Sequence, residues 1–185
     1  MEKILKIEKF KKKNCNDVKK IYMDSFTKED RFSWFNLILN VILRKTNIYT
    51  LSSENNLVAF IYIISYKNKN FILYLAVDKR YRNKGFGTYL LNWYLNNNKD
   101  KEILLNIDEI NEKFDDNIIR QKRLNFYLKN GFYLTDYLSV SKNLKANILS
   151  TKEEFNVKEY KQLDKRISKL FFCKNDKIEK RTKNN

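Results

Sequence analysis

The spacing of apolar and polar residues along the chain predicts both strands and helices. Seven short runs are alternating or continuously apolar, as is typical of strands, at residues 4–10, 48–51, 57–66, 71–77, 103–107, 132–138 and 144–149. Apolar residues recur at helical spacing at about residues 16–26, 32–43, 89–98, 118–130 and 157–170. Segments rich in Asn and Ser separate the three strands between residues 48 and 77, which predicts an antiparallel meander.

Local signals mark two helix ends and the end of the folded region. Asn156-Val157-Lys158-Glu159 is a capping-box pattern that starts the last helix, and Gly131 is placed to end the helix at 118–130. The tail Lys174–Asn185 is polar, and we expect it to be disordered. No linker divides the rest, so we expect a single domain over residues 1–173, with a core supplied by 43% hydrophobic residues.

The segment Phe32–Leu43 is apolar around most of a helical cylinder. This pattern is compatible with burial in the core, with a subunit contact and with the wall of a pocket. We favour core packing, and the sequence leaves a monomer and a homodimer equally open.

The chain carries a net charge of +16, supplied mainly by lysines that are spread over its whole length. One interpretation is a solvated lysine surface, and the other is a surface that binds nucleic acid. No zinc-finger or RNA-binding motif accompanies the basic residues. The first interpretation is therefore favoured, and we do not expect a nucleic-acid partner.

Histidine is absent, and the two cysteines, Cys15 and Cys173, lie far apart in the sequence. The lack of histidine excludes nucleophilic catalysis of the Ser-His or Cys-His type. The cysteine spacing gives no signal for a metal site or a disulfide framework, so we expect no metal. Residues 1–13 are too charged for a signal peptide, and the apolar stretch 32–43 is too short to span a bilayer. We therefore expect a cytoplasmic protein outside the membrane.

Only three glycines occur in the chain, and two of them lie in one turn, Arg82–Thr88. The turn joins the strand-like run Phe71–Val77 to the helical run that starts at Tyr89. A glycine-bearing strand-to-helix turn presents converging backbone N–H groups and the positive end of a helix dipole. The turn is therefore suited to bind a phosphate group.

Two motifs in this order and spacing identify a family. Leu75-Ala76-Val77-Asp78, followed by Tyr81-Arg82-Asn83-Lys84-Gly85-Phe86-Gly87-Thr88, matches the pattern [Q/R]-x-x-G-x-[G/A], and Arg123–Phe132 has the sequence RLNFYLKNGF. With these motifs, most of the stretch from Ile4 to Leu149 resembles the GNAT superfamily of acyltransferases. The resemblance implies an α+β fold with one central, mostly antiparallel mixed sheet. It further implies that the sheet is splayed between its fourth and fifth strands and flanked by helices.

The resemblance implies an N-acetyltransferase that uses acetyl-coenzyme A and a primary amine as acceptor. The amine would attack the thioester directly, main-chain groups at the end of the fourth strand would stabilise the oxyanion, and Tyr127 would act as the acid. The residues expected to contact the cofactor are Leu75, Ala76, Val77, Arg82, Asn83, Lys84, Gly85, Phe86, Gly87 and Thr88.

The chain departs from the family pattern at two places. Arg120 and Arg123 stand where relatives often carry an asparagine and a small residue, and these arginines could reach cofactor phosphate or an acidic acceptor. Phe71 stands where some relatives carry the general base. Asp108 and Glu109 are our candidates for this base. A water chain at Tyr74 is the alternative, and the two carboxylates are equally compatible with an ordinary loop.

Two acidic segments in this otherwise basic chain suggest where the acceptor amine binds. Five carboxylates lie between Asp108 and Asp116, and three more lie between the first two helices, at Asp24, Glu29 and Asp30. Together they could form an acidic mouth for a cationic amine, small or peptidyl, above a floor of Phe32, Trp34 and Phe35. A solvated loop explains the same charges. The competing function is a non-catalytic protein of this fold that binds nucleic acid or an acidic partner through its lysines.

Overall fold

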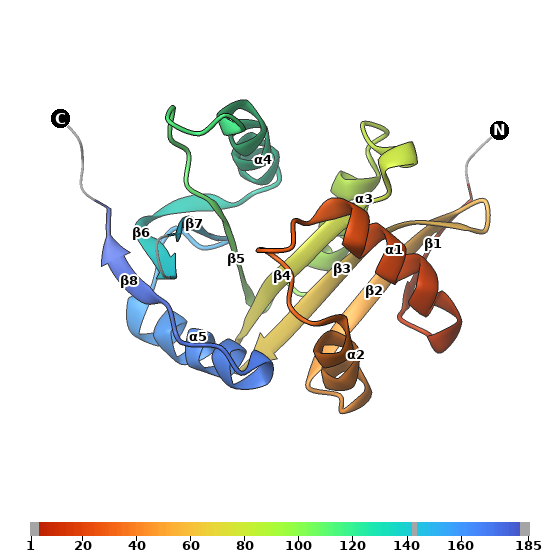
Figure 1. Cartoon of the computed structure of the whole chain (residues 1–185), viewed down its shortest axis with the longest axis horizontal. Coiled ribbons are helices and arrows are strands. Elements are labelled where there is room, and N and C mark those ends of the chain that lie inside the picture. Colours follow the sequence, from red (N-terminus) through yellow and green to blue (C-terminus); the bar gives the residue numbers. More distant parts are fainter. Residues whose placement is uncertain (1–3, 142–143, 182–185) are drawn as a thin grey trace. The chain divides into compact units, whose positions relative to one another are not determined.

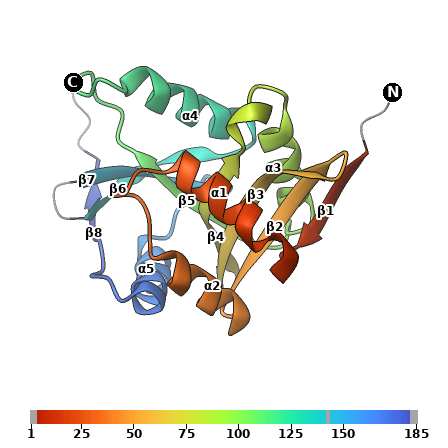
Figure 2. The ribbon, with the colours of Figure 1, turned by 45° about the vertical axis from the view of Figure 1, so that its right-hand side comes forward.

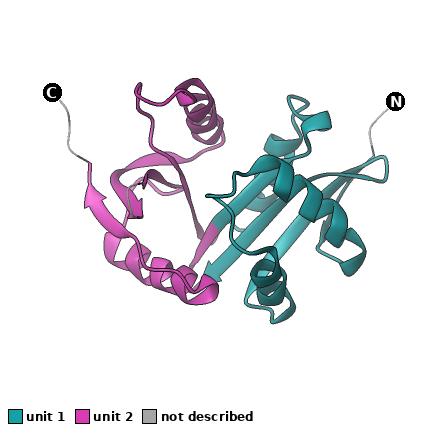
Figure 3. Cartoon of the chain, in the orientation of Figure 1, with its two compact units in different colours: residues 1–65, 72–99 teal, residues 66–71, 100–185 magenta. Residues whose placement is uncertain are grey.

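The computed structural model describes residues 4–141 and 144–181 of the chain (Figure 1). The chain forms two compact units (Figure 3). The first comprises Met1–Ser65 and Ile72–Lys99, and the second comprises Tyr66–Phe71 and Asp100–Asn185.

The first unit contains four neighbouring strands in chain order, β1-β2-β3-β4, and β1–β2 and β2–β3 pair antiparallel. Its strands are β1 (Leu5–Lys9), β2 (Thr46–Ser53), β3 (Asn56–Tyr66) and β4 (Lys69–Val77), and the first three residues of β4 belong to the second unit. Its helices are η1 (Lys12–Asn14), α1 (Cys15–Ser25), α2 (Trp34–Ile42), η2 (Lys79–Tyr81) and α3 (Phe86–Asn96).

Helices cover both faces of this sheet. Seven consecutive residues of β3, from Val58 to Ile64, are buried, as expected for a strand with no solvated face. Tyr62 points to α2, where its hydroxyl donates to the carbonyl of Leu37 at 3.0 Å. Tyr49 of β2 lies on the opposite face, since its partner is Ile61, and its ring contacts α3. Figures 1 and 2 show α1 and α2 on one face and α3 on the other.

The second unit contains β5 (Glu102–Asp108), β6 (Tyr133–Ser141), β7 (Leu144–Ser150) and β8 (Lys177–Lys180). These strands lie in the order β5-β7-β6-β8, and each neighbouring pair is antiparallel. Its helices are α4 (Asn117–Lys129) and α5 (Val157–Phe171). Gly131 follows the C-cap of α4 with φ of +82°, which is the left-handed conformation expected of a glycine that ends a helix.

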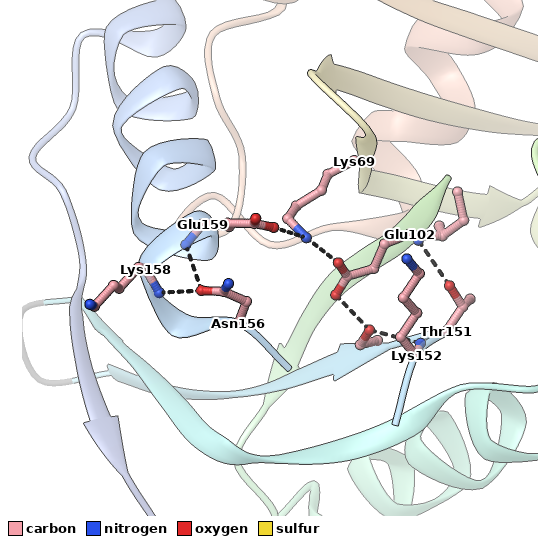
Figure 4. A network of polar contacts seen from close by, with 9 residues as sticks. Lys69, Glu102, Thr151, Lys152, Asn156, Lys158 and Glu159 are labelled. Carbon is pink, nitrogen blue, oxygen red and sulfur yellow. Dashed lines mark hydrogen bonds and ion pairs between the residues drawn. The ribbon is translucent and has the colours of Figure 1, made fainter. Parts of the chain in front are cut away.

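A buried ionic network holds the start of β4 within the second unit (Figure 4). The Lys69 ammonium forms ion pairs with Glu102 of β5 and with Glu159 of α5, the latter at 2.8 Å. Ser150 of β7 donates to the other Glu102 oxygen at 2.9 Å. Burial acts to lower the pKa of Lys69, but its hydrogen bonds to the two glutamates outweigh burial and raise it. The lysine therefore stays charged.

At the start of α5, only one of the two side-chain interactions of the predicted capping box is formed, namely that of Asn156. Asn156 Oδ1 accepts hydrogen bonds from the backbone N–H groups of Lys158 at 3.1 Å and of Glu159 at 3.2 Å (Figure 4). In a capping box, the Glu159 carboxylate would also accept a hydrogen bond from the backbone N–H of Asn156. Here the carboxylate pairs with Lys69 instead.

The predicted α+β fold, with its mostly antiparallel strands and its succession of elements, is confirmed. One expectation was wrong, and a second holds only in part. Lys177–Lys180, within the tail expected to be disordered, form β8, because the backbone of β6 offers them an edge to pair with. The segment 32–43 packs in the core only along one side, with Leu37 buried, while Phe35 is 71% and Ile42 68% exposed. A single domain over 1–173 and the splay between the fourth and fifth strands stay predictions.

Candidate active site

The glycine turn leads from β4 through η2 into α3, and its backbone is unusual at two residues. Asn83 has φ of +60° and Gly85 has φ of +80°. Gly85 is the N-cap of α3, and no side chain caps this helix end. A Cβ atom placed on Gly85 would meet no atom within 4 Å, so the left-handed conformation, rather than crowding, is what requires glycine here.

The N-terminus of α3 is therefore open to an external anion. The first N–H groups of a helix have no partner within the helix, and a glycine N-cap cannot supply a side-chain acceptor for them. Gly87 and Thr88 lie in this first turn, and Arg82–Gly85 are exposed. The helix dipole adds about half a positive charge at the same place.

Three cationic side chains surround the turn. The Arg82 guanidinium donates to the carbonyl of Val77 at 3.2 Å and to the Ser25 hydroxyl at 3.3 Å, and the residue is exposed. Two cations lie near the Tyr81 ring, because the Arg80 guanidinium and the Lys84 ammonium are both 5.5 Å from its centre. This arrangement favours a ligand with negative charge.

The end of β4 supplies the other predicted cofactor residues. Ala76 is buried, and Leu75 and Val77 are half-buried, so their side chains contribute packing. The Val77 carbonyl accepts from Arg82, which ties the strand end to the turn. Asp78 continues the connection, since its carboxylate accepts from the Arg80 backbone N–H at 2.9 Å and caps η2.

A cluster of tyrosine hydroxyls fixes the segment between α1 and α2 next to β4. The Tyr74 hydroxyl donates to the carbonyl of Asp30 at 2.9 Å and accepts from the N–H of Phe32 at 3.1 Å. The Tyr22 hydroxyl donates to the carbonyl of Phe32, also at 2.9 Å. Burial raises the pKa of both phenols. The Tyr74 hydroxyl thus has a structural role in holding this segment, which leaves it poorly placed for the proposed water chain.

Tyr127 lies on α4 in the second unit and is 8% exposed. Its ring packs edge-on against Phe126 and Phe132, with centroids 5.0 and 5.5 Å apart. Burial raises the pKa of the phenol to about 12. Within residues 4–141 and 144–181, no group forms a hydrogen bond with its hydroxyl, which remains available as a donor.

Arg120 and Arg123 hold the acidic loop to α4, a role that the sequence had not indicated. Arg123 pairs with Asp108 at 2.8 Å, and Arg120 pairs with Asp116 at 2.7 Å. Arg120 also donates to the Glu109 carbonyl at 3.0 Å. These ion pairs neutralise two of the five loop carboxylates, so the local acidic field is weaker than the composition implies. Glu109 and Asp108 as general bases stay predictions.

The predicted site residues fall into two groups. The β4 end and the glycine turn lie together in the first unit, as do Asp24, Glu29 and Asp30, whereas Tyr127, Asp108 and Glu109 lie in the second. That both groups form one site, and that the carboxylates form one acidic mouth, stay predictions. Sequence reasoning missed the tyrosine cluster because the partners of Tyr74 are 42 to 52 residues away in the sequence and no motif links them to it.

Two further observations concern the described part of the chain. Over residues 4–141 and 144–181, no three cysteine or acidic side chains gather in a way that could hold a metal ion. None of the helices in these ranges is both long enough and apolar enough to cross a membrane.

Comparison with known proteins identifies a matching family and several similar structures. Residues 44–134 match the family described as the acetyltransferase (GNAT) domain. No curated protein matches the chain in sequence. Among solved structures, a GNAT-family protein from Bacteroides thetaiotaomicron is similar at 16% identity and a TM-score of 0.74, covering 91% of this chain and 99% of its own.

Two further solved structures are similar to the chain, and each is a complex with coenzyme A or with an analogue that contains it. The first is an aminoglycoside 6′-N-acetyltransferase complexed with coenzyme A, at 16% identity and a TM-score of 0.65, covering 82% of this chain and 99% of its own. The second is Naa50 from Arabidopsis thaliana in complex with the bisubstrate analogue CoA-Ac-MVNAL, at 20% identity and a TM-score of 0.62, covering 82% and 99%. The family match over residues 44–134 and the fold agree with the two motifs of the sequence, and these residues are identified as a GNAT acetyltransferase domain.

Proposed function

We propose that this protein transfers an acetyl group from acetyl-coenzyme A to a primary amine, by direct attack of the amine on the thioester. The observation that carries the proposal is the uncapped N-terminus of α3, where Gly85 is left-handed and the space beside it is open. A pyrophosphate group would supply hydrogen-bond acceptors for the first N–H groups of α3 and negative charge for the surrounding cations.

The residues of the turn would hold the cofactor by its pyrophosphate. The N–H groups of Gly87 and Thr88 would donate to the phosphate oxygens, with the dipole of α3 aligned toward them. Arg82 is already anchored to Val77, so the guanidinium would lose little freedom when it binds an anion. Acetyl-coenzyme A supplies an activated acyl group, and the chain needs only to position it and stabilise charge.

The end of β4 would hold the reacting thioester. A main-chain N–H at or near Val77 would donate to the oxyanion that forms as the amine attacks. Tyr74 fixes the backbone of Asp30 and Phe32 beside the strand, which would give the acceptor a rigid boundary on this side. Rigid surroundings keep the reacting atoms within attacking distance.

Tyr127 would assist departure of the thiolate. With a pKa raised to about 12, the phenol is fully protonated at neutral pH and can act only as a donor. An alkyl thiol has a pKa of about 8.5, so the phenol stabilises the thiolate mainly by a hydrogen bond, and solvent completes the protonation. The absence of a competing partner among the described residues suits this role.

The acceptor class is supported by the similar proteins and by the remaining charges. Aminoglycoside 6′-N-acetyltransferase and the peptide portion of the Naa50 ligand represent a small and a peptidyl acceptor, respectively. Glu112 and Asp115 of the acidic loop are exposed and have no ion pair within the described ranges, so they could attract a cationic amine. Asp108 or Glu109 would accept the proton of that amine.

The proposal is tested by incubating the protein with acetyl-coenzyme A and a panel of amines and peptides, and measuring release of free thiol. We expect amine-dependent thiol release that falls at least about tenfold in kcat/KM for acetyl-coenzyme A in an Arg82→Ala variant. Lys99→Ala, an exposed change outside the turn, is the matched control. Salt-sensitive binding to nucleic acid, together with no thiol release for any amine, would instead support the non-catalytic alternative.

A further inference from the structure

A polar cavity of about 300 Å³ lies on the first unit, between α1, the turn that joins β2 to β3, and η2. None of the residues lining it belongs to the glycine turn Arg82–Thr88. The cavity has the volume of the smaller ligand pockets known in proteins. Its charged side chains come from two different elements, α1 and the segment Asp78–Arg80.

One pair of charges in this cavity is already satisfied. The Asp78 carboxylate is buried and receives the Arg80 guanidinium at 2.7 Å, together with the Arg80 backbone N–H at 2.9 Å. These hydrogen bonds lower the pKa of Asp78, so the carboxylate is ionised and the pair is neutral as a whole. The Arg80 side chain is 61% exposed and keeps further N–H groups for a ligand.

A second pair of charges makes no direct contact, but it acts on the first pair at a distance. After the mutual hydrogen bonds of Asp78 and Arg80, the charge of Lys20 also lowers the pKa of Asp78, and the charge of Asp17 also raises the pKa of Arg80. Asp17 and Lys20 stand three residues apart on the same face of α1, and both line the cavity. Over the described ranges, neither side chain forms an ion pair or hydrogen bond, either with the other or with a third residue. A negative and a positive group are therefore presented side by side.

The rest of the lining is compatible with a short carbon skeleton. Ile21 of α1, which is 2% exposed, and Leu57 of β3 are the two apolar residues of an otherwise polar lining. Asn55, at the tip of the turn with φ of +64°, adds a carboxamide that can donate and accept. The ligand that matches this set carries one ammonium and one carboxylate on a small aliphatic frame.

We propose that this cavity binds a small zwitterion of the α-amino acid class. Its ammonium group pairs with Asp17, and its carboxylate is held by Lys20 and the outer N–H groups of Arg80. Its carbon skeleton lies over Ile21 and Leu57. No residue of the turn Arg82–Thr88 lines this site, although Arg80 lies next to both, and the proposal does not depend on the protein being an acetyltransferase.

The experiment is a titration of the ¹⁵N-labelled full-length protein followed by amide chemical shifts. The probes are L-alanine, which carries both charges, ethylamine, which carries only the ammonium, and propionate, which carries only the carboxylate. We expect L-alanine to give saturable shifts at residues 17–21, 55–57 and 78–80, with a Kd in the millimolar range. Each single-charge probe is expected to bind at least about tenfold more weakly, because one charged contact is lost.

Matched variants complete the test. Asp17→Asn and Lys20→Gln should each weaken L-alanine binding about tenfold or more. Lys19→Gln, on the same helix but outside the cavity, should leave the affinity unchanged. The proposal is overturned by an absence of saturable shifts with L-alanine at tens of millimolar. It is equally overturned if ethylamine or propionate binds as tightly, or if Asp17→Asn keeps the full affinity.

Discussion

Replacement of Lys69 by methionine is expected to destabilise the second unit strongly. The lysine and Glu102 side chains are only 5% and 4% exposed, and they neutralise each other. A methionine fills a similar volume but leaves the Glu102 carboxylate buried, with the Ser150 hydroxyl as its remaining partner in the network. An uncompensated buried charge of this kind costs about 3–5 kcal/mol.

The two glutamates should contribute unequally. Glu159 is 46% exposed, so water can replace Lys69 around its carboxylate, and its loss should cost no more than about 1 kcal/mol. Glu102→Gln should be intermediate, because the amide can still accept from Ser150. The double variant Lys69→Met, Glu102→Leu removes both buried charges and should recover most of the loss, since a buried pair is worth little against apolar residues of similar size.

The assay is urea unfolding followed by far-UV circular dichroism, which reports on both units. Trp34 and Trp93 both lie in the first unit, so their fluorescence identifies unfolding of that unit alone. At about 2–4 °C per kcal/mol, a loss of about 3–5 kcal/mol in Lys69→Met should also lower Tm by roughly 6–20 °C. Lys67→Met is the control. Its exposed ammonium donates to Gln162 at 2.8 Å and lies 5.3 Å from the centre of the Tyr66 ring, and the loss of these exposed contacts should cost less than about 1 kcal/mol.

The reasoning would be refuted if Lys69→Met cost less than about 1 kcal/mol. It would also be refuted if the double variant were as unstable as the single one, since the penalty would then not come from the unpaired Glu102.

Three further predictions follow from single side chains. Tyr127→Phe should reduce kcat about a hundredfold while KM for acetyl-coenzyme A changes little, and an unchanged kcat in steady-state kinetics would rule out the donor role. Asp164 has a pKa raised to about 6 by burial and by the nearby Asp176, so its contribution to stability is present below about pH 4 and lost as pH rises through about 6. Asp164→Asn should therefore raise stability by about 1–2 kcal/mol at pH 8 and by nothing at pH 4, and equal Tm differences at both pH values would contradict this. Tyr74→Phe should cost about 1–3 kcal/mol and increase amide hydrogen exchange at Phe32, whereas unchanged exchange would show that the hydroxyl does not hold the segment.

The elements that could be predicted are those in which the signal is local. The periodicity of residues 57–66 and 71–77 indicates strands because every residue adds to one repeating pattern. Gly131 and Asn156 mark helix ends because their roles depend on backbone conformation and on N–H groups two or three residues away. Gly85 belongs to the same class, and its left-handed conformation is the local property that the motif reflects.

The features that could not be predicted depend on partners that are distant in sequence. In the sequence, nothing distinguishes Lys69 from the many surface lysines. Only the fold brings it to Glu102, which is 33 residues away. Arg123 is read from the motif as a ligand-binding candidate, yet folding of the acidic loop places Asp108 against it. β8 is too short and too polar for a strand signal, and it forms because β6 has an unpaired edge.

The central claim, that main-chain amides of the glycine turn hold the pyrophosphate, can be tested with the three glycines of the chain. Glycine-selective ¹⁵N labelling gives three amide signals, from Gly85, Gly87 and Gly131. Addition of coenzyme A should move the Gly85 and Gly87 signals downfield in a saturable way, as expected when an N–H donates to a phosphate oxygen. Gly131, whose N–H already donates to the Leu128 carbonyl at 3.2 Å, should move far less. Saturation of binding with the Gly85 and Gly87 signals unmoved would contradict the account.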